Sequence, residues 1–274
     1  MEILLIILVG IAYPGLITAI ALGLAYRRLL GVGGGSLRWA AAWGSREGLA
    51  ALAGVLAAAM GLAVMPWPFH PAGVTRAWLW AWPGLELAFL LPLAPALASG
   101  VPKVVRAAMR RTQIGAFGRA LLWVALASSL VIHADWRMAA LPVHLLAMAA
   151  ALVAFPIAVG WGPFDDEASI TGAGIHAGLA PALCEITDLA HDVATGALLA
   201  AALLAILPIA VVPIWLVPIL LIFGFGVVVG GLGRLQGRLP RLSLPAIMHF
   251  GWAYAAPLAA AAAVALIIAG RLVV

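Results

Sequence analysis

Apolar stretches, each long enough to cross a lipid bilayer, fill most of this chain of 274 residues. Hydrophobic residues make up 66% of the sequence and charged residues only 9%, so a water-soluble protein of this size would lack a polar surface. Lipid must therefore be the solvent for most of the chain. Since no hydrophilic run is long enough for a separate catalytic domain, we expect a single transmembrane domain over residues 1–274.

The apolar stretches predict an all-α membrane protein, a bundle of about eight transmembrane helices. Helices are expected because unpaired backbone groups are costly in lipid, and no segment alternates as a barrel strand does. The first stretch has no basic region before it and no small-residue cleavage site, so we do not expect a cleavable signal peptide. The predicted spans have approximate bounds 3–26, 47–66, 83–101, 115–133, 138–160, 187–208, 212–232 and 247–269.

Basic residues are concentrated in alternate gaps between the predicted spans. By the positive-inside rule these gaps are cytoplasmic, and both termini lie on the outer side of the cell inner (plasma) membrane. A loop at about 161–186 falls on the same inner side, yet it has no Lys or Arg and carries Asp165, Asp166 and Glu167. The rule alone does not explain an acidic inner loop, so we expect it to have another role. The basic residues of the three gaps are Arg27, Arg28, Arg38 and Arg46, then Lys103, Arg106, Arg110 and Arg111, then Arg234, Arg238 and Arg241.

Composition and motifs exclude several classes of function. The net charge of +5 follows the topology, and no basic patch interleaved with aromatic residues indicates a nucleic-acid partner. A single Cys184 excludes an intrachain disulfide, and it excludes a cysteine-ligated iron–sulfur or zinc site built from this chain alone. Phosphate-binding, hydrolase and zinc-protease motifs are missing from the sequence. We therefore expect no catalytic, cofactor-binding or metal-ligating residue in this chain.

Ionisable residues inside or near predicted spans need a reason, because charge is costly there, and Glu86, Arg119 and His144 are three of them. Glu86 is either a carboxylate at the membrane interface or a group on a proton path. Arg119 either extends its head group to the inner surface or pairs with a buried carboxylate. His144 is most simply a hydrogen-bonded core histidine.

The densest group of ionisable residues is Glu185, Asp188, His191 and Asp192. Spacings of three and four place the three acids on one face of a helix, with His191 beside Asp188. Acids so close together would repel if all were ionised in a dry place, and a shared proton is the condition that a proton relay uses. A solvated first helical turn is the alternative, and a metal site is a third, less specific one.

Four segments share a pattern with one family of membrane subunits. They are Tyr13-Pro14-Gly15-Leu16 with Arg27-Arg28-Leu29-Leu30-Gly31, then Ile114-Gly115-Ala116-Phe117 with Arg119, then Pro163-Phe164-Asp165 with Glu167-Ala168, and finally Leu239-Pro240-Arg241 with Met248 and Phe250-Gly251-Trp252. In these segments the chain resembles the eight-helix membrane subunit shared by respiratory complex I (subunit 1 of NADH–quinone oxidoreductase) and by group 4 membrane-bound NiFe-hydrogenases, including formate hydrogenlyase subunit 4.

The resemblance implies a non-catalytic subunit of an oxidoreductase complex that acts as a translocase. Such a subunit carries no cofactor. It anchors a peripheral arm with iron–sulfur clusters and a NiFe or quinone site, lies beside antiporter-like membrane subunits, and helps to couple electron transfer to proton or sodium movement. The implied ion-path residues are Asp165, Glu167, Asp188, Glu185, His191, Asp192, Glu86 and Arg119, with Asp188 in the place of the family's membrane glutamate. The implied docking residues for the peripheral arm are Pro163, Phe164, Asp165, Asp166 and Arg241.

The neutral stretch Leu242–Ile247 replaces charged residues of the quinone-reducing branch, so a hydrogenase-like or ferredoxin-linked complex fits the sequence better.

Two interpretations outside this family remain open. A stand-alone secondary transporter or permease could use Glu86, Arg119 and Asp188 for a substrate. The other is a structural scaffold whose ion path has decayed.

Overall fold

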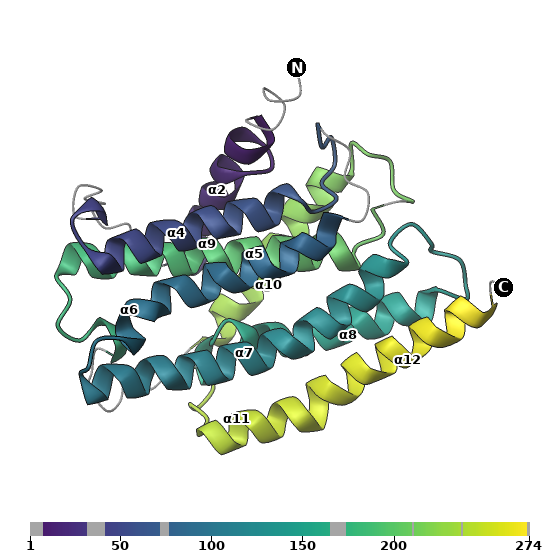
Figure 1. Ribbon diagram of the computed structural model, residues 1–274. Helices are drawn as coiled ribbons and strands as arrows, with labels where there is room; N and C mark the ends of the chain where they lie inside the picture. The colour runs from purple at the N-terminus through teal and green to yellow at the C-terminus, as the bar shows by residue number, and fades with distance from the viewer. Residues whose placement is uncertain are drawn as a thin grey trace. The chain divides into compact units, whose positions relative to one another are not determined.

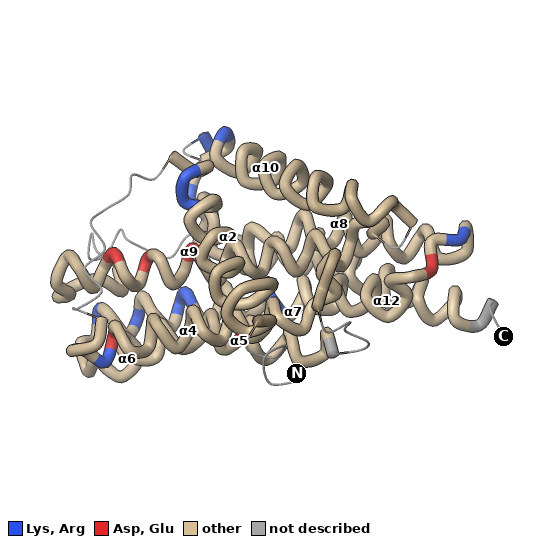
Figure 2. The backbone as a smooth tube through the Cα atoms, turned by 90° about the horizontal axis from the view of Figure 1, so that it is seen from above, with Lys and Arg blue, Asp and Glu red and all other residues tan. Residues whose placement is uncertain are grey.

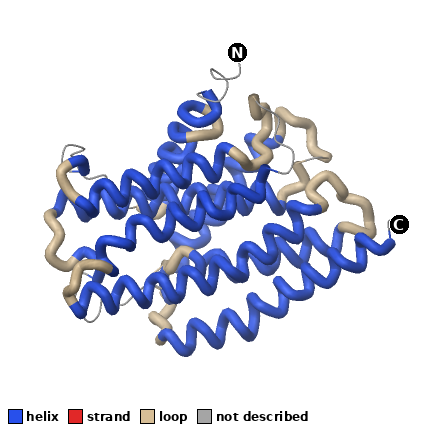
Figure 3. Tube along the Cα trace, in the orientation of Figure 1, coloured by secondary structure: helices blue, strands red, loops and turns tan. Residues whose placement is uncertain are grey.

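The structure, a computed structural model, describes residues 8–31, 42–71, 77–164, 174–209, 211–236 and 238–272. All regular elements in these ranges are helical (Figures 1 and 3). Eight helical segments are long and apolar enough to cross a membrane, so the predicted all-α, eight-span fold is confirmed. The side of the membrane that each end faces stays a prediction.

Several spans are composite. The first joins a π-helical turn, η1 (Leu8–Ala12), to α2 (Leu16–Leu29), and the last joins α11 (Leu244–Phe250), η6 (Gly251–Ala255) and α12 (Ala256–Leu272). The third runs through η2 (Ala77–Trp80), α5 (Ala81–Leu90), η3 (Leu91–Leu93) and α6 (Ala94–Leu97), because prolines at 92 and 95 remove backbone donors. The others are α4 (Arg46–Ala63), α7 (Pro102–Val131), α8 (Leu141–Ala158), α9 (Pro181–Ile206) and α10 (Val217–Leu235), and two short turns are η4 (Gly162–Phe164) and η5 (Gly174–His176).

Two helices, α7 and α9, begin well before their predicted spans. The α7 helix has 30 residues, from Pro102, whereas the predicted span began at 115. Its length of about 45 Å exceeds a hydrocarbon core of about 30 Å, so its basic first turns extend beyond the apolar part of the bilayer. Hydropathy marks only the part of a helix at lipid depth, and for this reason it placed Lys103, Arg106, Arg110 and Arg111 in a loop rather than on α7.

The chain divides into two compact units, and the single transmembrane domain over residues 1–274 stays a prediction. One unit contains Met1–Thr112 and Asp166–Ala201, and the other contains Gln113–Asp165 and Ala202–Val274. The helices α7 and α9 each contribute residues to both units.

In the first unit, α2 runs across the direction of α4 and α9 (Figure 1). Glycines make the crossing of α2 and α9 close. A Cβ atom added to Gly23 would lie 2.6 Å from Val193 Cγ2, and one added to Gly196 would lie 2.8 Å from the carbonyl oxygen of Leu22. In lipid, where apolar side chains gain little by leaving their solvent, such close backbone approach is a main source of helix association.

In the second unit, α8 packs on α12 through alanines. Ala147 and Ala150 of α8 meet Ala259 and Ala262 of α12, together with Ala125 of α7. A second apolar core joins the start of α7 in this unit to η4 and α11. Its buried members are Ile114, Ile157, Phe164 and Ile247.

Candidate functional site

Polar side chains gather in the first unit around the crossing of α2 and α9. Six of them form what we call the acid–base cluster: Arg27, Arg111, His176, Asp188, His191 and Asp192. Figure 2 shows the acidic positions along the first part of α9. Because α9 begins at Pro181, six residues before the predicted span, Asp188 and Asp192 lie in its second and third turns.

Arg27 and Asp192 form an ion pair at the crossing. The Arg27 Nη1 and Asp192 Oδ2 atoms are 3.7 Å apart, and the side chains are only 14% and 17% exposed. Arg27 lies four residues after the crossing glycine Gly23, and Asp192 lies four residues before Gly196. Residues four apart lie on one helical face, so the close approach of the two helices brings the two charges together.

Asp188 has a different partner. Its Oδ1 atom lies 3.1 Å from His176 Nε2, and its side chain is 51% exposed. His176 ends η5, a short turn in the second half of the acidic loop. A pair this exposed contributes little to stability, but it links the end of that loop to α9.

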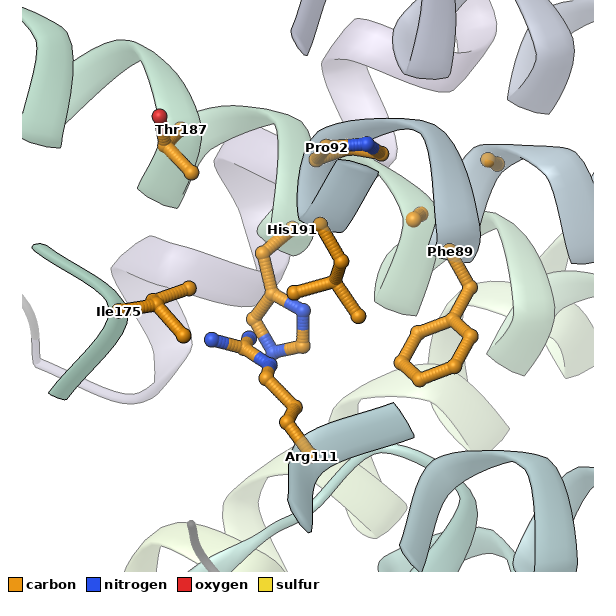
Figure 4. Close-up of a pocket in the computed structure, with 9 residues that line it drawn as sticks. Phe89, Pro92, Arg111, Ile175, Thr187 and His191 are labelled. Atoms are coloured by element: carbon orange, nitrogen blue, oxygen red, sulfur yellow. The ribbon is translucent and has the colours of Figure 1, made fainter. Parts of the chain in front are cut away.

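A small cavity lies behind these pairs, between α5, η3, α7, η5 and α9. It leaves about 10 Å³ for the centre of a water molecule, which is room for about one water. Figure 4 shows the Arg111 guanidinium and the His191 ring turned into it, with Phe89, Pro92 and Ile175 as apolar walls. The full lining is Ala88, Phe89, Pro92, Leu93, Arg111, Ile175, Thr187, His191 and Ala194.

The cavity has the polar groups that an ordered water needs. The Thr187 hydroxyl donates to the Leu183 carbonyl oxygen at 2.9 Å, so its oxygen can still accept a hydrogen bond. Arg111 supplies N–H donors, and its charge also acts on Asp188 and Asp192. His191 can accept a proton on one ring nitrogen and release one from the other. The cavity can therefore hold a water beside Arg111, Thr187 and His191.

The three acids that were predicted to share one face of a helix do not form a single site. Asp188 and Asp192 do lie on neighbouring turns, but they pair with separate basic residues, and Glu185 is half-buried one turn earlier. His191, expected beside Asp188, lines the cavity with Arg111 instead. Among the described residues no group of three or more His, Cys, Asp or Glu side chains could hold a metal ion.

Sequence reasoning missed three members of the cluster, namely Arg27, Arg111 and His176. The two arginines were interpreted only as markers of topology, and the histidine was not considered. A carboxylate at membrane depth needs a nearby cation. This requirement could have pointed to Arg27, which lies at the end of the first span.

Two other predicted ion-path residues lie on α5 and α7. Glu86 is half-buried on α5 and does not line the cavity. Arg119 lies on α7 and is 2% exposed, which makes it the largest fully buried side chain of the described residues. This burial speaks against the alternative in which Arg119 extends to the membrane surface, and its pairing with a buried carboxylate stays a prediction.

The predicted docking segment is a core element as far as it is described. The side chains of Pro163 and Phe164 are buried, and Phe164 packs on Phe250 with ring centroids 5.4 Å apart. Buried side chains cannot touch a partner protein, so these two would hold the loop in place rather than form the docking contact. Asp165, Asp166 and Glu167 lie outside the described residues.

Three segments of the family resemblance meet in the second unit. The Leu242 N–H donates to the Pro163 carbonyl oxygen at 2.8 Å, so the exposed Arg241 lies beside the start of the acidic loop. Phe117 packs on Trp252 with ring centroids 5.7 Å apart. Segments distant in sequence, around residues 117, 163 and 241–252, therefore build one end of an apolar core.

No protein-family model matches this chain, and no curated protein matches it. The sequence and the fold establish a multi-span helical membrane protein.

Proposed function

We propose that this chain is the membrane-anchor and ion-path subunit of a redox complex of the complex I or energy-converting hydrogenase type. A peripheral iron–sulfur arm would supply the electron-transfer energy for proton or sodium translocation. The observation that carries the proposal is the acid–base cluster. Two carboxylates of α9 are paired with bases from separate segments, and His191 of the same helix lines a water-sized cavity with Arg111, in a chain with only 9% charged residues. Ionisable groups retained at this cost in a membrane are typical of ion pathways.

The exposure of the groups suggests the order of a proton path. Asp188 is half exposed and accessible to water, whereas Asp192 is mostly buried beside Arg27. A proton would enter at Asp188, pass through the cavity water and His191, and reach Asp192. Arg27 and Arg111 would keep the buried carboxylates stable whenever they are ionised.

The contact between His176 and Asp188 suggests how the arm could act on this path. His176 lies within the acidic loop, so a movement of the loop would add or remove the imidazole beside Asp188. The proton affinity of Asp188 would change with it, because a neighbouring cation stabilises a carboxylate. The exposed Arg241, beside the start of the same loop, is a candidate docking residue together with Asp165 and Asp166.

Affinity purification of the tagged chain from its native membrane tests the anchor role. We expect iron–sulfur polypeptides to co-purify and to give an electron paramagnetic resonance signal after reduction. A chain that purifies alone from gently solubilised native membranes would overturn the proposal.

Ion uptake by vesicles that hold the assembled complex tests the path. Asp188→Asn and His176→Gln should lower ion uptake at least tenfold while electron transfer to an artificial acceptor continues. Asp135→Asn, an acid in the loop between α7 and α8, is the matched control and should leave uptake unchanged. Normal uptake in Asp188→Asn and Asp192→Asn would instead support a scaffold.

A stand-alone transporter is the second candidate, and the burial of Arg119 favours it. A fully buried guanidinium within a span commonly marks a substrate path. Solute uptake by liposomes that contain only this chain, abolished by Arg119→Leu, would establish the transporter and replace the first proposal.

A further inference from the structure

His144 lies in the first turn of α8, in the second unit, and its side chain is 1% exposed. Both ring nitrogens have a partner. Nδ1 lies 2.8 Å from the Ser129 hydroxyl oxygen of α7, and Nε2 lies 2.9 Å from the backbone carbonyl oxygen of Asp135. The Ser129 oxygen also lies 2.6 Å from the carbonyl oxygen of Ala205, near the end of α9.

The number of hydrogens that these three contacts require determines the protonation state of the His144 ring. A carbonyl oxygen only accepts, so the single hydroxyl hydrogen of Ser129 goes to Ala205. The carbonyl of Asp135 likewise needs a hydrogen on Nε2. The remaining contact, between Nδ1 and the Ser129 oxygen, is a hydrogen bond only if Nδ1 carries a hydrogen as well.

We propose that His144 is a proton-binding site, an imidazolium held by the Ser129 oxygen and the Asp135 carbonyl, whose proton fastens α7, α8 and the end of α9 to the 132–140 loop. The proposal does not depend on the redox-complex function, because it rests only on these contacts.

The surroundings of the ring suit a cation. The Trp136 indole is stacked on the His144 ring with centroids 3.9 Å apart and an interplanar angle of 4°. Its Nε1–H donates to the His133 carbonyl oxygen at 3.1 Å, and this bond fixes the indole in place. The face of an indole attracts a cation, and so does the partly negative carboxyl end of a helix such as α9 at Ala205.

Among the residues that the structure describes, His133 and Asp135 of the 132–140 loop interact electrostatically with His144, and Arg137 of the same loop pairs with Asp135. Hydrogen bonds from Arg137 are the main reason that the pKa of Asp135 is lowered to about 2, so this carboxylate stays negative near the ring. Burial, and next the charge of His144, lowers the pKa of His133. The faces of α7 and α12 that pack on α8 contribute alanines such as Ala125 and Ala259.

Loss of the proton would leave one ring nitrogen with a lone pair aimed at an acceptor. At least one of the contacts with Ser129, Asp135 and Ala205 must then break, because two hydrogens, one on the ring and one on the Ser129 hydroxyl, remain for three contacts. The segments that meet at His144 should thus be held together more loosely at high pH than at low pH.

Nitrogen-15 resonance of histidine-labelled full-length protein in lipid nanodiscs tests the proposal. The chain has 6 histidines, and a His144→Gln sample identifies the signal that is lost. At pH 7 we expect both ring nitrogens of His144 to show the shift of a protonated nitrogen. A non-protonated signal from either one at pH 7 would overturn the proposal.

Ser129→Ala provides a second test, with Ser128→Ala as the matched control. The Ser128 hydroxyl donates within its own helix, to the Val124 carbonyl oxygen at 2.8 Å. Ser129→Ala should convert a larger share of His144 to the neutral ring at pH 7, whereas Ser128→Ala should leave its signals unchanged. Equal behaviour of the two variants would contradict the proposal, and the wild-type spectrum decides it even if a variant fails to fold.

Discussion

Arg27 of α2 and Asp192 of α9 face each other across a helix crossing, with 3.7 Å between Nη1 and Oδ2. Each lies one turn from a glycine at which the two backbones approach closely, Gly23 in α2 and Gly196 in α9. The small residues and the charges therefore act together. The glycines allow contact between the helices, and that contact gives a mostly buried carboxylate its counter-charge.

Removal of either charge should destabilise the protein. Because the pair is partly exposed, we expect Arg27→Gln or Asp192→Asn to cost roughly 1–3 kcal/mol, below the ~3–5 kcal/mol of a fully buried pair. The free energy of unfolding in mixed detergent micelles, titrated with sodium dodecyl sulfate, measures the loss. The double variant should lose less than the sum of the single variants, since neither charge is then left alone. Arg28→Gln, at the exposed neighbouring position, is the control and should change stability little.

Alanine at the crossing should destabilise a helix that alanine would otherwise favour. A Cβ at Gly23 would meet both Val193 Cγ2 and the Val193 backbone, so Gly23→Ala should cost about 1–3 kcal/mol through overpacking. At Gly226 of α10 a Cβ would have open space, and Gly226→Ala should be neutral or slightly stabilising. Thermal unfolding followed by circular dichroism compares the two variants. Loss of stability in both would show that the crossing at Gly23 has no special role.

Truncation of Phe164 should loosen the start of the acidic loop. The ring packs on Phe250 within a buried apolar core, so Phe164→Ala should lose about 3 kcal/mol of stability. Phe223→Ala on α10 is the control, because that ring is 68% exposed and faces lipid or solvent. Protease digestion at residues 165–173 provides a local measurement, and Phe164→Ala should be cut faster than Phe223→Ala. Equal rates would mean that Phe164 does not hold the loop.

The ion pair between Asp135 and Arg137 should respond to acid. Its hydrogen bonds, of 2.9 and 2.7 Å, are the main reason that the pKa of Asp135 falls to about 2 from the usual value of 3.8. A carboxyl whose pKa is depressed in the folded state contributes stability above its unfolded value, and that contribution is lost as pH falls from about 4 through 2. The side chain is reached by solvent, so the effect should stay local to the 132–140 loop.

Carbon-13 resonance of the Asp135 carboxyl group measures this titration. Arg137→Gln should raise the midpoint toward 3.8, because it removes the principal cause of the shift. The control is Arg238→Gln, a basic residue in another loop, which should leave the midpoint where it is in the unmodified protein. A midpoint that does not move in Arg137→Gln would show that another group holds the Asp135 carboxylate.

The number of spans and their helical form follow from the hydropathy pattern alone. A segment such as 141–158 has no way to satisfy its backbone in lipid other than an α-helix, so hydropathy alone was enough. The same argument failed at the ends of helices. The start of α7 at Pro102 is polar, and a hydropathy pattern cannot distinguish a helix in the interfacial region from a loop.

The ion-pair partners of the α9 carboxylates, in contrast, depend on the packing of the helices. The periodicity of α9 placed Asp188 and Asp192 on neighbouring turns, but it could not show that one pairs with His176 and the other with Arg27. Local spacing fixes which residues share a helical face, because backbone geometry is the same in every helix. Which face meets which neighbour depends on where two backbones can approach, and that is set by Gly23 and Gly196 together, 173 positions apart in the chain.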